Sequence, residues 1–86
     1  MGKKTGKQTY LLTNPPVIIS TGTVVGPFEG CGPLAEDFDE VLTDIRDGQS
    51  SFEKAERSIL IKACRLALDH AGFSSTQVDL FLAGDL

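Results

Sequence analysis

The stretch from Ser50 to Leu86 constrains the fold most, because it signals one long helix followed by a tight turn and an apolar strand. Ser50 and Glu53 have the spacing of a capping box, in which each side chain accepts a hydrogen bond from a backbone N–H group at the helix start. Good helix formers fill the following positions, and Gly72 is placed to end the helix in the left-handed conformation. The sequence therefore predicts a helix of about twenty residues that begins near Ser51.

This helix is apolar around most of its circumference. At about 100° per residue, its polar side chains gather on one narrow stripe. The apolar side chains that cover nearly all the rest are Ile59, Leu60, Ile61, Ala63, Cys64, Leu66, Ala67 and Leu68. An ordinary surface helix buries a single stripe, so an arc this wide predicts packing between two layers of structure.

Three segments are predicted to be strands. Val78 to Ala83 ends in four consecutive apolar residues, as expected for a strand covered on both faces. Val17 to Ser20 is rich in β-branched residues and follows Pro15-Pro16, which forces an extended backbone. Residues 10–12 form a further short candidate within the polar, lysine-rich start of the chain.

The middle of the chain is predicted to be a long loop and a second helix. Four glycines and two prolines between Thr21 and Pro33 exclude regular structure there, and loops of this length are often functional. Pro33 suits the first turn of a helix, and apolar residues then recur at helical spacing. We expect a helix from Leu34 to Arg46, and we see no internal repeat or domain boundary in residues 1–86.

The size of the chain limits what these elements can bury. A folded chain of 86 residues buries only about 60–65% of its unfolded surface, which is too little for a helix with two apolar sides. With 41% hydrophobic and 23% charged residues, the composition is that of a globular protein. We therefore interpret residues 1–86 as one portion of a longer α/β protein or of an obligate assembly.

Charge and hydropathy exclude several classes of partner. The net charge of -4 argues against nucleic acid, because phosphate binding needs a basic surface and Lys3, Lys4 and Lys7 form only a small one. No run approaches the ~18–20 apolar residues of a membrane span, and no signal peptide is visible. We therefore expect an intracellular protein without a transmembrane segment. The two cysteines give no disulfide framework, so we expect their thiols to be reduced.

Two motifs have a functional and a structural interpretation, and the structural one is favoured for both. Gly30-Cys31-Gly32-Pro33-Leu34-Ala35 matches a dinucleotide-binding G-x-G-x-x-A pattern, but about ten loop residues separate it from the preceding strand. A group of acids resembles a cation site, but it lacks the alternating ligands and the glycine of a calcium loop. The acids are Glu36, Asp37, Asp39, Glu40 and Asp44. Acidic residues in the first turns of a helix interact favourably with the helix dipole, and on a solvent-exposed face they need no metal ion.

The cysteines and the single histidine give no strong catalytic signal either. Cys31 lies in a glycine-rich loop, where a thiol can be exposed beside a helix N-terminus, but the acids that follow would disfavour its thiolate. His70 is placed to cap a helix C-terminus, so a Cys31–His70 dyad is not favoured. Cys64 is most simply a small core residue.

The order of the elements resembles the start of the thiolase and β-ketoacyl synthase folds. The resemblance lies in the strand at 17–20, the Gly/Pro-rich loop, the Asp47-Gly48-Gln49-Ser50 turn, the helix that ends in Ala-Gly-Phe and the strand that opens with Val78-Asp79. It implies a layered αβαβα fold in which residues 1–86 give the first part of one layer and the long helix lies between two sheets.

Within that superfamily, the whole chain resembles the stage V sporulation protein AD family of spore-forming bacteria. The most specific matching segments are Gly6-Lys7-Gln8-Thr9 and Leu82-Ala83-Gly84-Asp85-Leu86. The resemblance implies a non-enzymatic component that binds dipicolinic acid and supports its uptake, with calcium, into the developing spore. The alternative is an acyl-transfer condensing enzyme with a covalent thioester intermediate.

The resemblance also implies partners and a location. It implies contacts with the remainder of the chain's own thiolase-like domain and with other proteins of a dipicolinic acid transport complex, as well as a homodimer. It places the protein in the forespore, peripheral to the inner membrane. The resemblance transfers no catalytic, cofactor-binding or metal-binding residue to this sequence, because neither Cys31 nor Cys64 matches the nucleophile position. We expect the ligand-binding residues to lie beyond Leu86.

Overall fold

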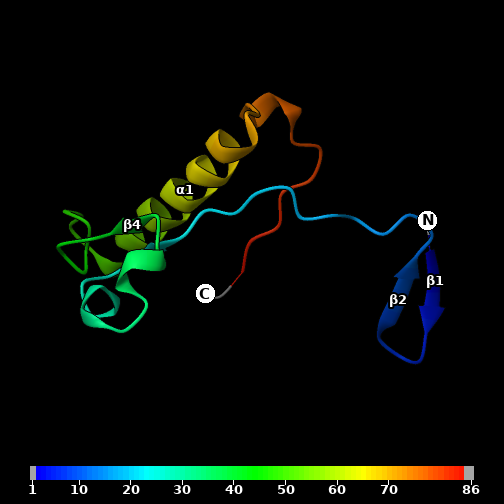
Figure 1. The fold of residues 1–86 in the computed structure, drawn as a ribbon, viewed down its shortest axis with the longest axis horizontal. Coiled ribbons are helices and arrows are strands. Elements are labelled where there is room, and N and C mark those ends of the chain that lie inside the picture. Colours follow the sequence, from blue (N-terminus) through cyan, green and yellow to red (C-terminus); the bar gives the residue numbers. More distant parts are fainter. Residues whose placement is uncertain (1, 85–86) are drawn as a thin grey trace.

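The computed structural model describes residues 2–84, in which one long helix, four short strands and three single-turn 3-10 helices occur. Figure 1 shows the long helix α1 and the central turns gathered at one end of the molecule, and an N-terminal hairpin at the other. An extended stretch of chain joins these two parts (Figure 1). This mixture of helix and strand agrees with the predicted α/β class.

Helix α1 (Phe52–Ala71) confirms the central prediction from the sequence. Gly72 ends it with φ 73°, and the backbone N–H of Phe73 donates to the carbonyl of Leu68 at 2.9 Å. The predicted capping box of Ser50 and Glu53 is wrong by one residue. Ser51 is the cap and accepts from the Lys54 N–H at 3.2 Å, and a lysine side chain has no acceptor with which to return the bond.

The predicted helix from Leu34 to Arg46 is wrong. This segment contains the short 3-10 helix η2 (Ala35–Asp37) and the strand β4 (Glu40–Val41), which pairs in parallel with β3 (Val24–Val25). Backbone hydrogen bonds flank the pair, from Glu40 to the Thr23 carbonyl at 3.1 Å and from Leu42 to the Val25 carbonyl at 2.8 Å. Pairing with β3 satisfies the backbone groups that a helix would have bonded internally.

Two side chains, those of Asp39 and Thr23, hold this pairing in place. The Asp39 carboxylate accepts a hydrogen bond from the Thr23 N–H at 2.8 Å, and the Thr23 hydroxyl oxygen accepts from the Asp39 N–H at 2.9 Å. Aspartate side chains commonly bond to backbone groups in this way and thereby disfavour a helix interior.

The prediction that the segment from Thr21 to Pro33 has no regular structure is wrong, because the segment contains β3 and the 3-10 helix η1 (Glu29–Cys31).

The N-terminal hairpin pairs β1 (Gly2–Thr5) with β2 (Thr9–Leu12) in antiparallel register, Lys3 opposite Leu11 and Lys4 opposite Tyr10. Gly6 has φ 71° in the connecting turn, a conformation that glycine adopts without strain. The strand predicted at residues 10–12 is therefore confirmed as part of β2, whereas β1 was not predicted.

The two other predicted strands do not form within residues 2–84. Val17 to Ser20 and Val78 to Ala83 are stretches without regular structure, and the 3-10 helix η3 (Ser75–Gln77) precedes the second. A strand is defined by hydrogen bonds to a neighbouring strand, and neither segment has such a neighbour in the described part of the chain. Their apolar side chains, including Ile18 and Leu82, are consequently exposed.

The core of this structure is very small. Leu42 and Ala55 are its buried hydrophobic residues, with 6% and 2% of their surface exposed, and no large side chain among residues 2–84 is fully buried. The accessible surface is 7416 Å², against about 4,900 Å² for a folded monomer of 9.2 kDa. The radius of gyration is 16.2 Å, against about 12 Å for a compact domain of this length. Residues 2–84 do not form two layers around α1, so thiolase-like layering and the assignment of residues 1–86 to such a domain stay predictions.

Candidate functional site

One face of α1 is covered by the segment from Ser20 to Val25. The Ser20 hydroxyl donates to the carbonyl of Ala67 at 2.6 Å, and His70 Nδ1 lies 2.7 Å from the carbonyl of Thr21. Since a carbonyl can only accept, the Nδ1 atom of His70 carries the proton in this contact. His70 therefore tethers the segment to the last turn of the helix, a role that the sequence did not predict.

Gly22 lies directly against the helix backbone. A Cβ atom at this position would collide with the carbonyl oxygen of Ala63 and would lie 2.6 Å from the backbone nitrogen of Ala67. Such distances are below van der Waals contact, so glycine is required for the close approach of segment and helix. This contact orients the loop that follows and thereby places β3 beside α1.

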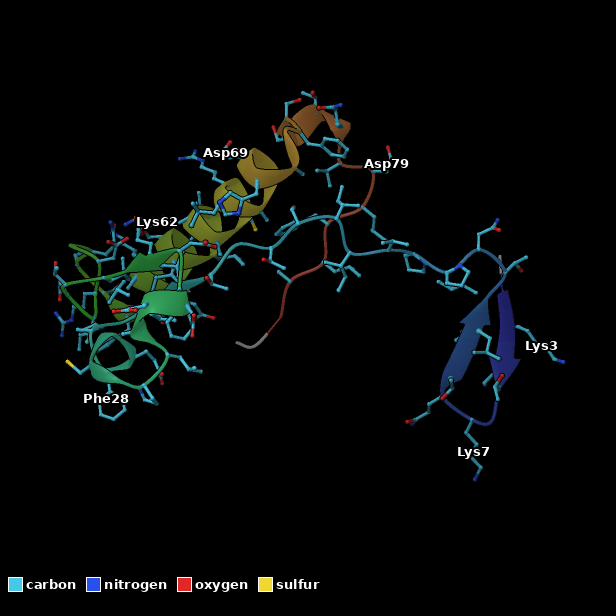
Figure 2. The ribbon with its side chains drawn as sticks, in the orientation of Figure 1. Lys3, Lys7, Phe28, Lys62, Asp69 and Asp79 are labelled. Carbon is cyan, nitrogen blue, oxygen red and sulfur yellow. The ribbon has the colours of Figure 1, made fainter. Side chains whose placement is uncertain are left out.

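A polar cluster joins the loop after β4 to the middle of α1. Asp47 has φ 50°, and its carboxylate accepts hydrogen bonds from the Ser58 hydroxyl and the Lys62 ammonium, both at 2.7 Å. Lys62 Nζ also lies 3.5 Å from Glu40 Oε2, so the lysine bridges β4 and the loop (Figure 2). Ser58 and Lys62 are four residues apart, which places them on the same side of the helix.

The charges in this cluster stabilise one another. The hydrogen bond from Lys62, followed by that from Ser58, lowers the pKa of the Asp47 carboxyl. The same hydrogen bond raises the pKa of the Lys62 ammonium, and Glu40 contributes in the same direction. Nearby, Asp44 accepts from the backbone N–H groups of Gly48 and Arg46, which lowers the pKa of Asp44. Both partners of the Asp47–Lys62 pair are thus charged over a wide pH range.

Sequence reasoning missed this cluster, although a signal was present. The polar stripe of the predicted helix already contained Ser58 and Lys62, and Asp47-Gly48 marked a sharp turn before it. The sequence did not show that this turn folds back onto the helix and brings Asp47 to Ser58 and Lys62. The cluster has the chemistry of a structural ion pair, because Ser58 and Lys62 both donate to the Asp47 carboxylate.

The glycine motif at residues 30–35 has a packing explanation. A Cβ atom on Gly30 would collide with Cγ1 of Val41, so the missing side chain lets η1 pack against β4. The motif runs from the end of η1 to the first residue of η2, two single-turn 3-10 helices, rather than into the first turn of a long helix. A pyrophosphate needs such a helix N-terminus, and residues 30–35 do not provide it.

The predicted acidic group is dispersed. Asp39 bonds to Thr23, Glu40 faces Lys62, and Asp44 closes the turn that contains Asp47. No group of three or more His, Cys, Asp or Glu side chains within residues 2–84 is arranged to hold a metal ion. Asp39, Glu40 and Asp44 thus each contact a different group of the protein.

The two cysteines are free thiols in different surroundings. Cys31 is exposed at the end of η1, and Cys64 is half-buried on α1. His70, the candidate partner in the dyad that the sequence did not favour, is bonded to the carbonyl of Thr21.

The second face of α1 borders an open groove. The groove runs between the helix and the segment that follows η3, and its apolar lining comes from Ile61, Cys64, Leu68, Val78 and Phe81. Ile61 is 43% exposed, as is expected for a residue on the face opposite Gly22. The described residues thus build one covered face and one open face on the same helix. None of the helices described in residues 2–84 is long and apolar enough to span a membrane.

Comparison with known proteins shows the family of this chain, which the contacts described above do not. The family model for stage V sporulation protein AD matches residues 6–86. The chain is 40% identical over 84 residues to stage V sporulation protein AD of Bacillus subtilis (strain 168). This match covers 98% of the chain and 25% of the length of that relative. The chain therefore belongs to the stage V sporulation protein AD family.

Proposed function

We propose that this chain forms part of a sporulation protein that binds dipicolinic acid and supports its uptake, with calcium, into the developing spore. The single observation that carries the proposal is the match to stage V sporulation protein AD over nearly the whole chain. The role in sporulation comes from the relative's name, and the ligand comes from the family resemblance. The protein acts as a binding component of a membrane-associated transport complex and not as an enzyme.

In this proposal, residues 1–86 have a structural role within a thiolase-like domain. Helix α1 presents one face to the Ser20–Val25 segment and the other to an open apolar groove, which suits a helix that lies between two layers. The rest of the protein's own domain supplies the second layer and the ligand-binding groups. Dipicolinic acid carries two carboxylates, and its recognition calls for cationic or N–H donors grouped in one pocket.

The proposal is tested with the purified full-length gene product and with spores. Isothermal titration calorimetry with dipicolinic acid should show saturable binding, and monocarboxylate picolinic acid should bind more weakly. Spores that lack the gene should contain far less dipicolinic acid than wild-type spores. Absence of binding together with normal spore content would overturn the proposal.

The competing activity is acyl transfer by a condensing enzyme. Incubation of the same protein with an acyl thioester, followed by intact-protein mass spectrometry, distinguishes the two. A stable mass increase equal to one acyl group would show a covalent intermediate and would favour the enzyme. An unchanged mass with preserved dipicolinic acid binding supports the binding role.

A further inference from the structure

Asp47 is the one aspartate of this sequence that is followed by glycine. In an Asp-Gly pair the backbone nitrogen of the glycine can attack Cγ of the aspartate, because glycine has no side chain to hinder the approach. A bond forms between this nitrogen and Cγ, the proton of the nitrogen and the hydroxyl group of the carboxyl leave together as water, and a succinimide ring results. Water then opens the ring at either carbonyl group and gives aspartate or isoaspartate.

The structure holds this pair in a tight turn. Asp47 and Gly48 have φ 50° and 72°, and the N–H of Gln49 donates to the carbonyl of Arg46 at 2.9 Å. Two central residues with positive φ inside such a hydrogen bond are the features of a type I′ turn, for which Asp-Gly is a favoured sequence. The residue pair that suits this turn is therefore also the pair that is prone to succinimide formation.

Both reacting groups are engaged in hydrogen bonds. The N–H of Gly48 donates to the Asp44 carboxylate at 3.0 Å. The Asp47 carboxylate accepts from the Ser58 hydroxyl and the Lys62 ammonium, both at 2.7 Å, and its side chain is 15% exposed. These contacts direct the nitrogen and the carboxylate to different partners, whereas attack requires the two reacting atoms to be aligned about 3–3.5 Å apart.

The charge of Lys62 acts in the same direction as the geometry. A carboxylate is a poor target for the glycine nitrogen, because it has no hydroxyl group to lose, so the reaction proceeds from the protonated carboxyl. The hydrogen bond from Lys62, followed by that from Ser58, lowers the pKa of Asp47. The reactive protonated form is therefore scarce in the folded protein.

We propose that Asp47-Gly48 is a site of spontaneous isoaspartate formation, and that the hydrogen bonds from Lys62 and Ser58 suppress the reaction in the folded protein. Isomerisation adds one methylene group to the backbone of the turn and leaves the carboxylate attached directly to Cα. The turn then loses its contacts with α1, and Lys62 keeps Glu40, 3.5 Å away, as its acidic neighbour. The inference is independent of dipicolinic acid binding, because every contact that carries it lies between Glu40 and Lys62.

The test follows isoaspartate at residue 47 during warm incubation of the full-length gene product in slightly acidic buffer. Isoaspartate has the mass of aspartate, so the protein is digested with a protease that cleaves before aspartate but not before isoaspartate, and the peptides are separated and identified by mass spectrometry. The same protein unfolded in guanidinium chloride gives the unrestrained rate. We expect the folded protein to react more than about tenfold more slowly, since two hydrogen bonds to a charged group must be broken first.

Matched variants separate the contacts of Asp47 from charge in general. Lys62→Met should raise the rate in the folded protein about tenfold, because it removes a charge-assisted hydrogen bond, and Ser58→Ala should raise it less. Lys54→Met removes the same charge from an exposed position of the same helix and should leave the rate unchanged. An unchanged rate in both Lys62→Met and Ser58→Ala, or equal rates in folded and unfolded wild-type protein, would overturn the proposal.

A loss of overall stability gives a different result. Gly22→Ala disturbs the contact between α1 and the Ser20–Val25 segment and leaves the groups around Asp47 in place. The free energies of unfolding of Gly22→Ala and Lys62→Met are compared in urea titrations beside their rates of isomerisation. Faster isomerisation in Lys62→Met than in a Gly22→Ala protein of equal or lower stability supports the proposal. Equal acceleration at equal loss of stability would show that unfolding alone controls the reaction and would overturn it.

Discussion

Residues 1–86 should not fold as an independent monomer when they are expressed alone. The structure exposes about 2,500 Å² more surface than a compact protein of its mass, and about 55–60% of a protein surface is apolar. At ~25 cal/mol per Å², the burial that is not achieved corresponds to roughly 35 kcal/mol. This exceeds the ~5–15 kcal/mol by which domains are stable, so the isolated segment should be oligomeric, aggregated or molten.

The assay combines light scattering for mass with thermal melting followed by circular dichroism. The full-length gene product is the reference and should give a defined mass and a cooperative melt. The isolated segment should give a broad transition and a mass above 9.2 kDa. A monodisperse monomer with a sharp melt would refute the reasoning from exposed surface.

A single substitution gives a matched control for this prediction. Leu60 is 41% exposed in the structure and lines an open hollow between α1 and Ala83. Leu60→Asp should improve the solubility of the isolated segment, because it removes apolar surface from water. In the full-length gene product the same change should abolish soluble expression, because it buries an unpaired charge. Equal behaviour of Leu60→Asp in both contexts would show that nothing covers this face.

Four further predictions concern the full-length gene product. Gly22→Ala should lower the free energy of unfolding by about 1–3 kcal/mol in urea titrations, whereas Gly26→Ala, whose Cβ would meet no atom within 4 Å, should change it little. Ser51→Ala should cost about 0.5–2 kcal/mol and Ser50→Ala much less, since Ser51 is the observed cap. Asp47 has a lowered pKa, so its contribution to stability should be present above about pH 4 and be lost as the pH falls through its folded pKa. Lys62 has a raised pKa, so its contribution to stability should be lost only as the pH rises above about 10.5. Asp47→Asn should reduce the dependence of the melting temperature on pH in both the acidic and the alkaline range. Cys31→Ser should leave dipicolinic acid affinity within tenfold of wild type by calorimetry, and a larger loss would show that this exposed thiol takes part in binding.

The elements that the sequence determined are those whose signals are local. Helix α1 depends on a serine cap, on good helix formers and on Gly72, all within about twenty residues of one another. The same holds for β2, which pairs across a short turn with β1. Interactions between residues that are close in the sequence can be inferred from the sequence itself. The predicted and observed bounds of these elements therefore agree to within one or two residues.

The remaining features were decided by contacts between distant residues. The segment after Pro33 has a helical pattern of apolar residues, but pairing of β4 with β3 and the bond between Asp39 and Thr23 replace the helix. The Asp47–Lys62 contact joins groups 15 residues apart, and neither spacing nor composition reveals it.

Two segments with a strand-like sequence, Val17 to Ser20 and Val78 to Ala83, do not form strands. The β-branched residues of the first segment and the apolar run of the second favour strands, but a strand exists only where a neighbour accepts and donates its hydrogen bonds. Composition and periodicity thus determined which surfaces of this protein are apolar and where its helix begins and ends. Which of those surfaces are covered is visible in the three-dimensional structure and not in the sequence, because covering depends on partners that lie far away along the chain.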